Sequence, residues 1–375
     1  MSSNPFSKNR WYIVNNVRDV SSPALLIYPD RIENNIRKII SIAGNVDLLR
    51  PHVKTHKIPE IIRLQMKYGI HKFKCATIAE VEMVAACGAD DILLAYQPVG
   101  PNLERFFNLK QGFPDTKISC IADSEEVIMQ LSDKAKKTGS ETHVWLDINN
   151  GMNRTGVDPG IAAVKLFKLI MDLPMLKAEG LHVYDGHIHE KDLSVRQKIC
   201  NDAFAPVINL VNELKKLGDT PLSIVAGGTP TFPIHAIRSG VETSPGTLLL
   251  WDFGYSESFT DMEYLHAAVL LMRIISKPGR DLICIDLGHK AIASEMPQPR
   301  IKILGLDNYV IINHNEEHMV LRTLEAGDRK IGDVLYGIPY HICPTVDRYD
   351  SVTVVKDGKA TEQWTVEARK RRITY

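Results

Sequence analysis

The first two thirds of the chain alternate short apolar segments with amphipathic ones, and this alternation restricts the fold more than any other sequence feature. Nine segments have the length and residue types of strands, at 24–28, 46–50, 72–75, 91–94, 117–122, 143–147, 178–182, 223–226 and 247–250. Helical patterns separate them, for example at 31–43 and 124–137. Eight or nine strands in about 230 residues predict a closed (β/α)8 barrel of the TIM type, with an open doubly wound sheet as the alternative.

The pattern changes after residue 251. Short β-rich segments follow at 265–275, 281–287, 309–313, 318–321, 333–336 and 351–355, with no long helical pattern between them. Such a series predicts a smaller antiparallel β domain. We therefore expect a barrel at residues 21–255 and a β domain at 256–375, to which residues 1–20 can add a further segment.

Composition argues against several classes of protein. The 375 residues include 45 basic and 45 acidic side chains, so no net charge favours binding to nucleic acid or an anionic membrane. No apolar run approaches the ~18 residues of a membrane span, and the polar start at residues 1–4 is unlike a signal peptide. The six cysteines are dispersed rather than arranged as a disulfide scaffold. We expect a cytoplasmic protein that acts on a small molecule.

A basic cluster follows the second apolar segment. Residues 50–57 read Arg-Pro-His-Val-Lys-Thr-His-Lys, with Lys54 at the predicted mouth of the barrel. Desolvation and cationic neighbours lower the pKa of a lysine until its free amine can attack a carbonyl. The cluster favours Lys54 as a Schiff-base lysine, and a solvated basic loop is the alternative.

Two more polar segments follow predicted strands, where the chemistry of such barrels is located. In segment 147–156, Arg154 offers a charged fork for an anionic oxygen, although an ordinary pair with a surface carboxylate is the alternative. In segment 180–190, Tyr184 can pack on a ring and donate a hydrogen bond. His187 and His189 are candidate acid or base groups beside it.

Two glycine-containing segments lie near the last predicted strands, whose loops frequently bind phosphate in barrels. Successive amides at Gly227 and Gly228 can form a concave nest for phosphate, and Thr229 adds a hydroxyl. Gly246 and Thr247 form a second candidate. A reactive lysine, a phosphate nest, an arginine for a phenolate and a stacking group together indicate a site for pyridoxal 5′-phosphate.

These segments resemble the alanine-racemase-like, fold-type III pyridoxal-phosphate enzymes, in particular the D-threonine aldolase and D-serine dehydratase family. The resemblance runs almost end to end, through residues 50–57, 75–77, 91–96, 151–156, 227–231, 245–247 and 341–346. It implies that Lys54 carries the cofactor, that Arg154 contacts its phenolic oxygen and that Tyr184 lies beside it. It also implies that the two glycine loops hold the phosphate, and that the protein is a homodimer with active sites near the interface.

A possible metal pair lies in the predicted β domain. On an extended segment, residues i and i+2 face the same way, so His341 and Cys343 could share one ion, while a buried cysteine beside a surface histidine is the alternative. The resemblance implies that this pair holds a divalent metal beside the substrate. Imidazole with thiolate suits zinc, and additional oxygen ligands would admit manganese.

A metal that coordinates a hydroxyl points to a 3-hydroxy amino acid as substrate. Retro-aldol cleavage of a D-threonine-like substrate would give glycine and an aldehyde, whereas dehydration of D-serine or D-threonine would give a 2-oxo acid and ammonia. The family resemblance favours the aldolase reaction. It also implies a histidine base shortly after Tyr184, but Glu190 occupies the sixth position after it, with His187 and His189 just before.

Two alternatives to a lyase remain. An amino-acid racemase needs no metal, so the pair His341 and Cys343 disfavours it. A non-catalytic pyridoxal-phosphate-binding protein needs only Lys54, Arg154 and the glycine loops, so the metal pair and the second domain favour catalysis.

Overall fold

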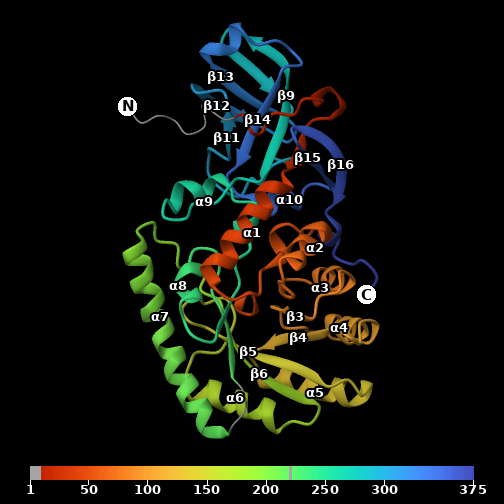
Figure 1. Cartoon of the computed structure of the whole chain (residues 1–375), viewed down its shortest axis with the longest axis vertical. Coiled ribbons are helices and arrows are strands. Elements are labelled where there is room, and N and C mark those ends of the chain that lie inside the picture. The colour runs from red at the N-terminus through yellow and green to blue at the C-terminus, as the bar shows by residue number, and fades with distance from the viewer. Residues whose placement is uncertain (1–9, 219–221) are drawn as a thin grey trace. The chain divides into compact units, whose positions relative to one another are not determined.

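The structure is a computed structural model that describes residues 10–218 and 222–375 (Figure 1). The chain divides into two compact units. The barrel unit comprises Ile36–Gly246 and Glu367–Tyr375, and the β unit comprises Met1–Asn35 and Thr247–Val366, of which residues 1–9 lie outside the described part. These limits differ from the expected 21–255 and 256–375, because the segments 21–35 and 247–255 belong to the β unit.

The barrel unit contains seven parallel strands, each paired with the next in chain order. They are β2 (Lys72–Cys75), β3 (Asp91–Leu94), β4 (Lys117–Ala122), β5 (Thr142–Ile148), β6 (Leu176–Val183), β7 (Ser223–Ala226) and β8 (Val241–Thr243). Helix α2 (Pro59–Lys67) precedes β2, and the helices between the strands are α3 (Ile78–Ala86), α4 (Pro101–Gly112), α5 (Glu125–Thr138), α6 (Ile161–Asp172), α7 (Leu193–Leu214) and α8 (Phe232–Ala236). This alternation confirms the predicted barrel class.

The eighth position of the barrel is occupied by residues 49–52, here called the closing stave. Leu49 forms an isolated parallel bridge with Thr243 of β8, and His52 forms one with Lys74 of β2. Its backbone is hydrogen-bonded to both neighbouring strands. Arg50 N donates to Thr243 O of β8 at 2.9 Å, and Pro51 O accepts from Lys74 N of β2 at 2.9 Å. The stave thus joins β8 to β2 and closes the barrel without a regular strand.

Two strands predicted from sequence have another conformation. In place of a strand at 46–50, Val46–Leu48 form a 3-10 turn, because the Asn45 side chain accepts a hydrogen bond from Asp47 N and caps it. In place of a strand at 247–250, Thr247–Leu249 form a second 3-10 turn. The last barrel strand is β8, which was not predicted.

Polar caps and glycines explain where the barrel helices begin and end. Helix α3 begins where the Thr77 side chain accepts from Glu80 N, and α5 begins where Ser124 accepts from Val127 N. Helix α5 ends at Gly139, whose left-handed conformation (φ 66°) suits a residue without a side chain.

The β unit contains a nine-stranded, mainly antiparallel sheet. Its strands are β1 (Ala24–Ile27), β9 (Ala268–Gly279), β10 (Leu282–Ile285), β11 (Ile301–Leu304), β12 (Tyr309–His314), β13 (Met319–Thr323), β14 (Val334–Pro339), β15 (Ser351–Lys356) and β16 (Lys359–Thr365). Strand β1 was expected to begin the barrel, but it pairs with β9 antiparallel and with β15 in parallel. The six predicted β segments of this region are confirmed as β9, β10, β12, β13, β14 and β15.

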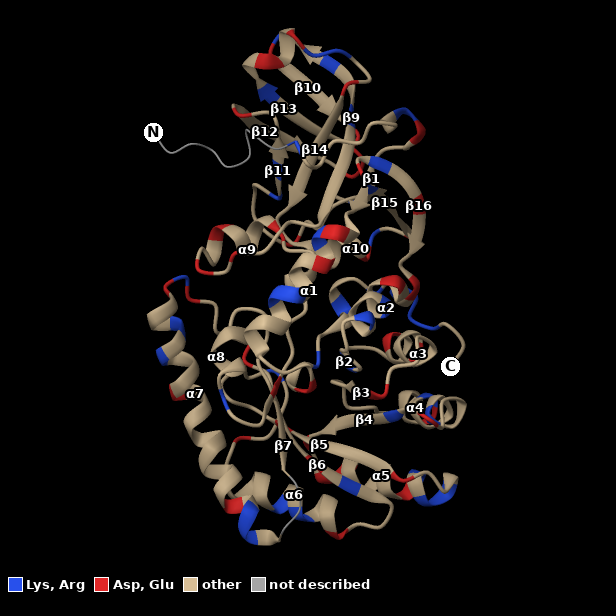
Figure 2. Ribbon diagram, in the orientation of Figure 1, with Lys and Arg blue, Asp and Glu red and all other residues tan. Residues whose placement is uncertain are grey.

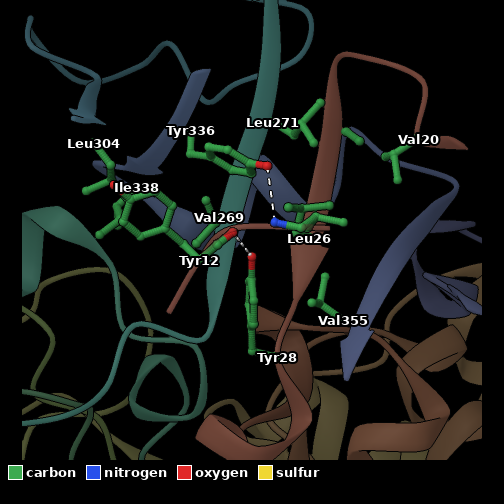
Figure 3. Packing of buried hydrophobic residues seen from close by; sticks show 12 residues of the cluster. Tyr12, Val20, Leu26, Tyr28, Val269, Leu271, Leu304, Tyr336, Ile338 and Val355 are labelled. Carbon is green, nitrogen blue, oxygen red and sulfur yellow. Dashed lines mark hydrogen bonds between the residues drawn. The ribbon is translucent and has the colours of Figure 1, made fainter. Parts of the chain in front are cut away.

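The core of the β unit explains why the N-terminal segment belongs to it. Tyr12, Leu26 and Tyr28 are buried against Val269 and Tyr336 (Figure 3). The Tyr28 hydroxyl donates to Tyr12 O at 2.6 Å, so a buried polar group is satisfied inside this cluster. Helix α1 (Pro29–Ala43) follows β1 and spans the boundary between the two units.

The 45 basic and 45 acidic residues are spread over both units of the chain. Figure 2 shows basic and acidic residues interspersed along the ribbon of each unit. In the described part of the chain, no helix is both long enough and apolar enough to cross a membrane.

Candidate active site

A pocket of about 500 Å³ opens among the loops that follow the barrel strands. This volume lies in the range of sites for small molecules and cofactors. Its charged lining comes from the closing-stave region and from the ends of the three strands β2, β4 and β5, and includes Lys54, Lys74, Asp123, Asp147 and Arg154. His52, His182 and Tyr184 line it as well. The pocket therefore brings together Lys54, Arg154 and Tyr184, three of the residues predicted from sequence.

Lys54 lies in a 3-10 turn, Val53–Thr55, directly after the closing stave. The His52 Nδ1 accepts a hydrogen bond from Lys54 N at 3.3 Å and caps this turn. The side chain is half-buried, and its Nζ lies 5.6 Å from the centroid of the Tyr184 ring. A short turn anchored by a buried imidazole thus presents the amine to the pocket.

The basic neighbours of Lys54 in sequence do not supply the cationic surroundings that were predicted. Arg50 turns away and forms ion pairs with Asp91 at 2.8 Å and Glu242 at 2.7 Å. Burial lowers the pKa of His56 to about 3, and burial with the charge of Lys54 lowers the pKa of His52. Both imidazoles are therefore neutral near pH 7. The cations that share the pocket with Lys54 come from other strands, at Lys74 and Arg154.

Tyr184 lies at the centre of these cations. The Arg154 guanidinium carbon lies 4.8 Å from its ring centroid, within cation–π range. A side chain at Gly186 would overlap the ring, and one at Gly228 would crowd it at 3.1 Å. Two glycines, one two residues after Tyr184 and one in the first glycine loop, therefore make room for the tyrosine ring.

The two glycine loops contact each other within the barrel unit. Gly228 N donates to Thr231 Oγ1 at 3.2 Å, and Gly246 N donates to Thr229 Oγ1 at 3.4 Å. Gly227 has φ +81°, a conformation that side chains disfavour, and an added Cβ would also meet the His235 ring. Thr247, the first residue of the second segment of the β unit, has its hydroxyl 3.6 Å from Cys343 Sγ.

A buried cluster supports the first glycine loop. Asp185 accepts from Thr231 Oγ1 at 2.7 Å and pairs with His235 Nε2 at 2.8 Å, and Cys200 Sγ lies 3.4 Å from that nitrogen. These three potential metal ligands come together in the described chain. The Asp185 carboxylate contacts Thr231, His235 and Cys200 at once, so in this structure the cluster is a hydrogen-bonded support for the loop.

The two histidines predicted as bases do not line the pocket. His187 lies beside the loop after β5, where its Nε2 would be 3.0 Å from a Cβ at Gly151. His189 is exposed. Their assignment as bases stays a prediction.

His341 and Cys343 come together in the β unit by a different geometry from the one predicted. The segment is not a strand: His341 occupies the N-cap position of α10 (Ile342–Val346) without a side-chain capping bond, and Cys343 lies in the first turn of this helix. Glu295 adds a carboxylate at 2.6 Å from His341 Nδ1. Burial opposes the charged imidazole, but Cys343, Asp252 and Glu295 raise the pKa of His341 to about 9. Imidazole, thiol and carboxylate are all ligands that zinc accepts.

Sequence reasoning did not single out Lys74, and it placed Asp147 and His182 in polar segments at strand ends without giving either a role. All three are buried and line the pocket. Inward positions of barrel strands are normally filled by bulky apolar residues. The signal for Lys74 was that a lysine stands at a buried position of the predicted strand 72–75. The sequence alone could not show that Lys74 points into the barrel while Lys72 does not.

Comparison with known proteins agrees with this architecture. A family model described as "Alanine racemase, N-terminal domain" matches residues 27–252, and one described as "Putative serine dehydratase domain" matches residues 267–355. The chain belongs to the alanine racemase N-terminal domain family. Family membership implies pyridoxal 5′-phosphate as cofactor and makes the chain a pyridoxal-phosphate-dependent enzyme.

Relatives in this family match nearly the full chain. A D-threonine aldolase from an Arthrobacter species is 29% identical, with 93% of each chain covered. A 3-hydroxy-D-aspartate aldolase from Paracoccus denitrificans is 28% identical, with 94% of this chain and 92% of the relative covered. The crystal structure of D-threonine aldolase from Filomicrobium marinum superposes with a TM-score of 0.87 at 25% identity, covering 94% and 96% of the two chains.

The residues present fit this family's cofactor. The pocket gathers a lysine amine, a guanidinium and an aromatic ring, as an anionic pyridine requires. In the second glycine loop, the buried Ser244 hydroxyl has no hydrogen-bond partner among the described residues. A buried hydroxyl without a partner is costly unless a ligand satisfies it.

Proposed function

We propose that this chain is a pyridoxal-phosphate- and divalent-metal-dependent lyase that cleaves D-3-hydroxy amino acids, and that its reaction is retro-aldol cleavage of D-threonine-like substrates to glycine and an aldehyde. One observation carries the proposal: a pocket containing Lys54, Arg154 and Tyr184 occurs in a chain that matches aldolases over more than nine tenths of its length. The side chain of the preferred substrate is left open within this class.

Each pocket residue has a distinct proposed role. Lys54 binds the cofactor through its amine, Arg154 binds an anionic oxygen, and Tyr184 packs beside the ring. The loops containing Gly227–Thr229 and Gly246–Thr247 bind the phosphate with amides and hydroxyls. When bound, the cofactor supplies an electron sink for bond cleavage at the substrate's α-carbon.

The metal is proposed at His341 and Cys343, with Glu295 as an additional oxygen ligand. This donor set lies within the β unit and combines nitrogen, sulfur and carboxylate oxygen. A zinc or manganese ion there would act as a Lewis acid toward a substrate hydroxyl.

Borohydride reduction tests the cofactor assignment. Purified holoprotein should show an imine absorbance, and reduction should leave the cofactor's mass on the peptide that contains Lys54. Lys54→Ala should lose the absorbance, while the matched change Lys165→Ala, on an exposed face of α6, should retain it. Stoichiometric bound cofactor with an unmodified Lys54 would contradict the assignment.

Product analysis tests the reaction. D-threonine and D-serine are incubated side by side with the holoenzyme, with the L isomers as controls. Glycine and an aldehyde support the proposed cleavage. A 2-oxo acid and ammonia support the second candidate, a D-serine or D-threonine dehydratase, which is favoured by the match of residues 267–355 to a serine dehydratase domain.

Metal analysis tests the proposed metal site. His341→Ala and Cys343→Ser should each lower bound metal and turnover, whereas His318→Ala, an exposed histidine of the same unit, should change neither. Chelation should abolish turnover, and zinc or manganese should restore it. Full activity after exhaustive metal removal would exclude the Lewis-acid role.

Homodimerisation with active sites near the interface stays part of the proposal. Light scattering coupled to gel filtration should give twice the 42.1 kDa mass of the chain.

A further inference from the structure

Lys74 is a second amine in the pocket, and neither the predicted site nor the proposed roles include it. It lies in β2 with 2% of its surface exposed, and its Nζ is 5.6 Å from the Tyr184 ring centroid. The Nζ of Lys54 lies at the same distance from that ring. The pocket is therefore lined by two lysines that approach one phenol.

The surroundings of Lys74 differ from those of a structural lysine. Among the described residues, no carboxylate lies within ion-pair distance of its Nζ, and its one hydrogen-bonding neighbour is His182 Nε2 at 3.5 Å. An ammonium buried without an anion is costly, and such a group loses its proton readily. Burial and the charge of Lys54 lower the pKa of Lys74 to about 7.

The neighbouring histidine has a defined proton arrangement. His182 Nδ1 lies 2.7 Å from Asp147 Oδ1. Burial alone would raise the pKa of Asp147, but the hydrogen bond with His182 lowers it, so the carboxylate is ionised and can only accept. His182 therefore carries its proton on Nδ1 and presents the lone pair of Nε2 to Lys74.

We propose that Lys74 is the proton-transfer residue of this pocket, held in place by the pair His182 and Asp147. The inference rests on the proposed lyase function and names the acid–base group that function requires. Lys74 is the group that acts on the substrate, whereas His182 and Asp147 are positioning residues.

The proposed reaction supplies a balanced task for one such group. In retro-aldol cleavage, the substrate's hydroxyl loses a proton, and the α-carbon of the glycine product gains one. The neutral Nζ of Lys74 accepts the first proton as the O–H bond breaks, and its ammonium form later donates a proton to carbon. No net proton is consumed, and no further reactant is needed.

The pH dependence follows from the groups that face Lys74. The segment before α2 supplies the basic neighbours Arg50, His52 and Lys54. Strands β5 and β6 supply Asp147 and His182, and the residues directly after β6 supply Tyr184 and Asp185. Because the neutral amine is the base, kcat should rise with pH through about 7.

The first experiment compares Lys74→Met with Lys72→Met in the holoenzyme. These are the same change two residues apart in β2, and Lys72 instead pairs with Glu242 at 2.7 Å. Lys74→Met should lower kcat about a hundredfold or more with little change in KM, and should remove the rise near pH 7. Lys72→Met should keep the pH profile. A Lys74→Met enzyme with raised KM but normal kcat and pH profile would overturn the proposal.

Chemical rescue separates proton transfer from a structural role. Lys74→Ala with full cofactor loading should regain part of its kcat when methylamine or ethylamine is added, whereas His182→Ala should not. Absence of rescue in a correctly folded, loaded Lys74→Ala enzyme would count against the assignment.

Two further measurements do not depend on substrate cleavage. In protein without cofactor, the ring nitrogens of His182 should show an NMR titration near neutral pH that Lys74→Met abolishes. In holoenzyme, exchange of glycine α-hydrogens in D2O should be lost in Lys74→Met. If the wild type cleaves no hydroxy amino acid, the proposed lyase function fails while these two results still decide the role of Lys74; unchanged results in both would refute it.

Discussion

The two ends of the barrel carry similar numbers of charged groups but arrange them differently. At the amino ends of the strands, Arg50, Lys72 and Lys117 each contact at least one carboxylate. At the carboxyl ends, Lys54, Lys74 and Arg154 surround the pocket, whose acidic lining is limited to Asp123 and Asp147. Charges that are neutralised within the protein stabilise the fold, whereas an excess of cations is suited to an anionic ligand.

The amino end is a connected network of ion pairs. Arg50 joins Asp91 to Glu242, Lys72 also contacts Glu242, and Lys117 contacts both Asp91 and Glu179. Burial opposes the charge of Arg50, but the Asp91 and Glu242 carboxylates raise its pKa. The network links the first residues of strands β2, β3 and β4 with β6 and β8. These ion pairs therefore cross-link several barrel strands at their amino ends.

Removing the centre of this network should have the largest effect on stability. Arg50→Met removes the buried guanidinium that joins Asp91 to Glu242 and leaves these carboxylates only Lys117 and Lys72, which should cost about 3 kcal/mol of unfolding free energy. Urea denaturation measures this loss. Arg63→Met, at an arginine 58% exposed and 3.9 Å from Glu60, should change stability by less than about 0.5 kcal/mol. Equal effects of the two changes would remove the distinction between a buried network and a surface pair.

The opposite end should show the reverse pattern. Arg154→Met removes an exposed guanidinium whose pocket neighbour is the Tyr184 ring, so cofactor affinity or kcat/KM should fall about 10–100-fold. Its unfolding curve should match that of the wild type, because no buried charge loses a partner. A large loss of stability with normal cofactor binding would show that Arg154 stabilises the fold, as the amino-end cations do, and does not bind the cofactor.

Acid should weaken the amino end in a defined window. Burial alone would raise the pKa of Glu179, but His143 and Lys117 lower it to about 2, against about 4.3 in an unfolded chain. Its stabilisation is therefore complete above about pH 4.3 and disappears as the pH falls toward 2. Glu179→Gln should cost about 1–2 kcal/mol at pH 7 and nothing near pH 2.

Unfolding measured across this pH range, with Glu141→Gln as control, checks that prediction. Glu141 is 46% exposed and pairs with Lys177, so its replacement should have little effect at any pH. A cost of Glu179→Gln that persists unchanged to pH 2 would contradict the assigned ion pairs.

Sequence patterns predicted the parts of the molecule whose information is local. The strands at 72–75, 91–94 and 117–122 were correctly placed, because apolar runs bounded by turns specify them. The pairing of β1 with β9 and β15 depends on residues more than two hundred positions away, and no local pattern records it. Lys54, Arg154 and Tyr184 were found because strand ends in a barrel converge, as the pocket shows.

The residues around Lys54 illustrate what local reasoning cannot supply. Four basic neighbours in sequence suggested its activation, yet Arg50 is committed to Asp91 and Glu242. Lys74 lies twenty positions away and reaches the same pocket only because β2 pairs with the closing stave. Proximity along the chain and proximity in space lead to different electrostatic conclusions here.

The closing stave also bears on where the barrel can open locally. Pro51 has no amide hydrogen, so the junction between the stave and β2 relies on the bond from Lys74 N to Pro51 O where a regular strand would add a reciprocal bond. Lys54 follows one side of this junction, and Lys74 belongs to the other. Hydrogen exchange at the Lys74 amide would therefore report the local opening that separates the two amines, and the same event would admit water to the pocket between them.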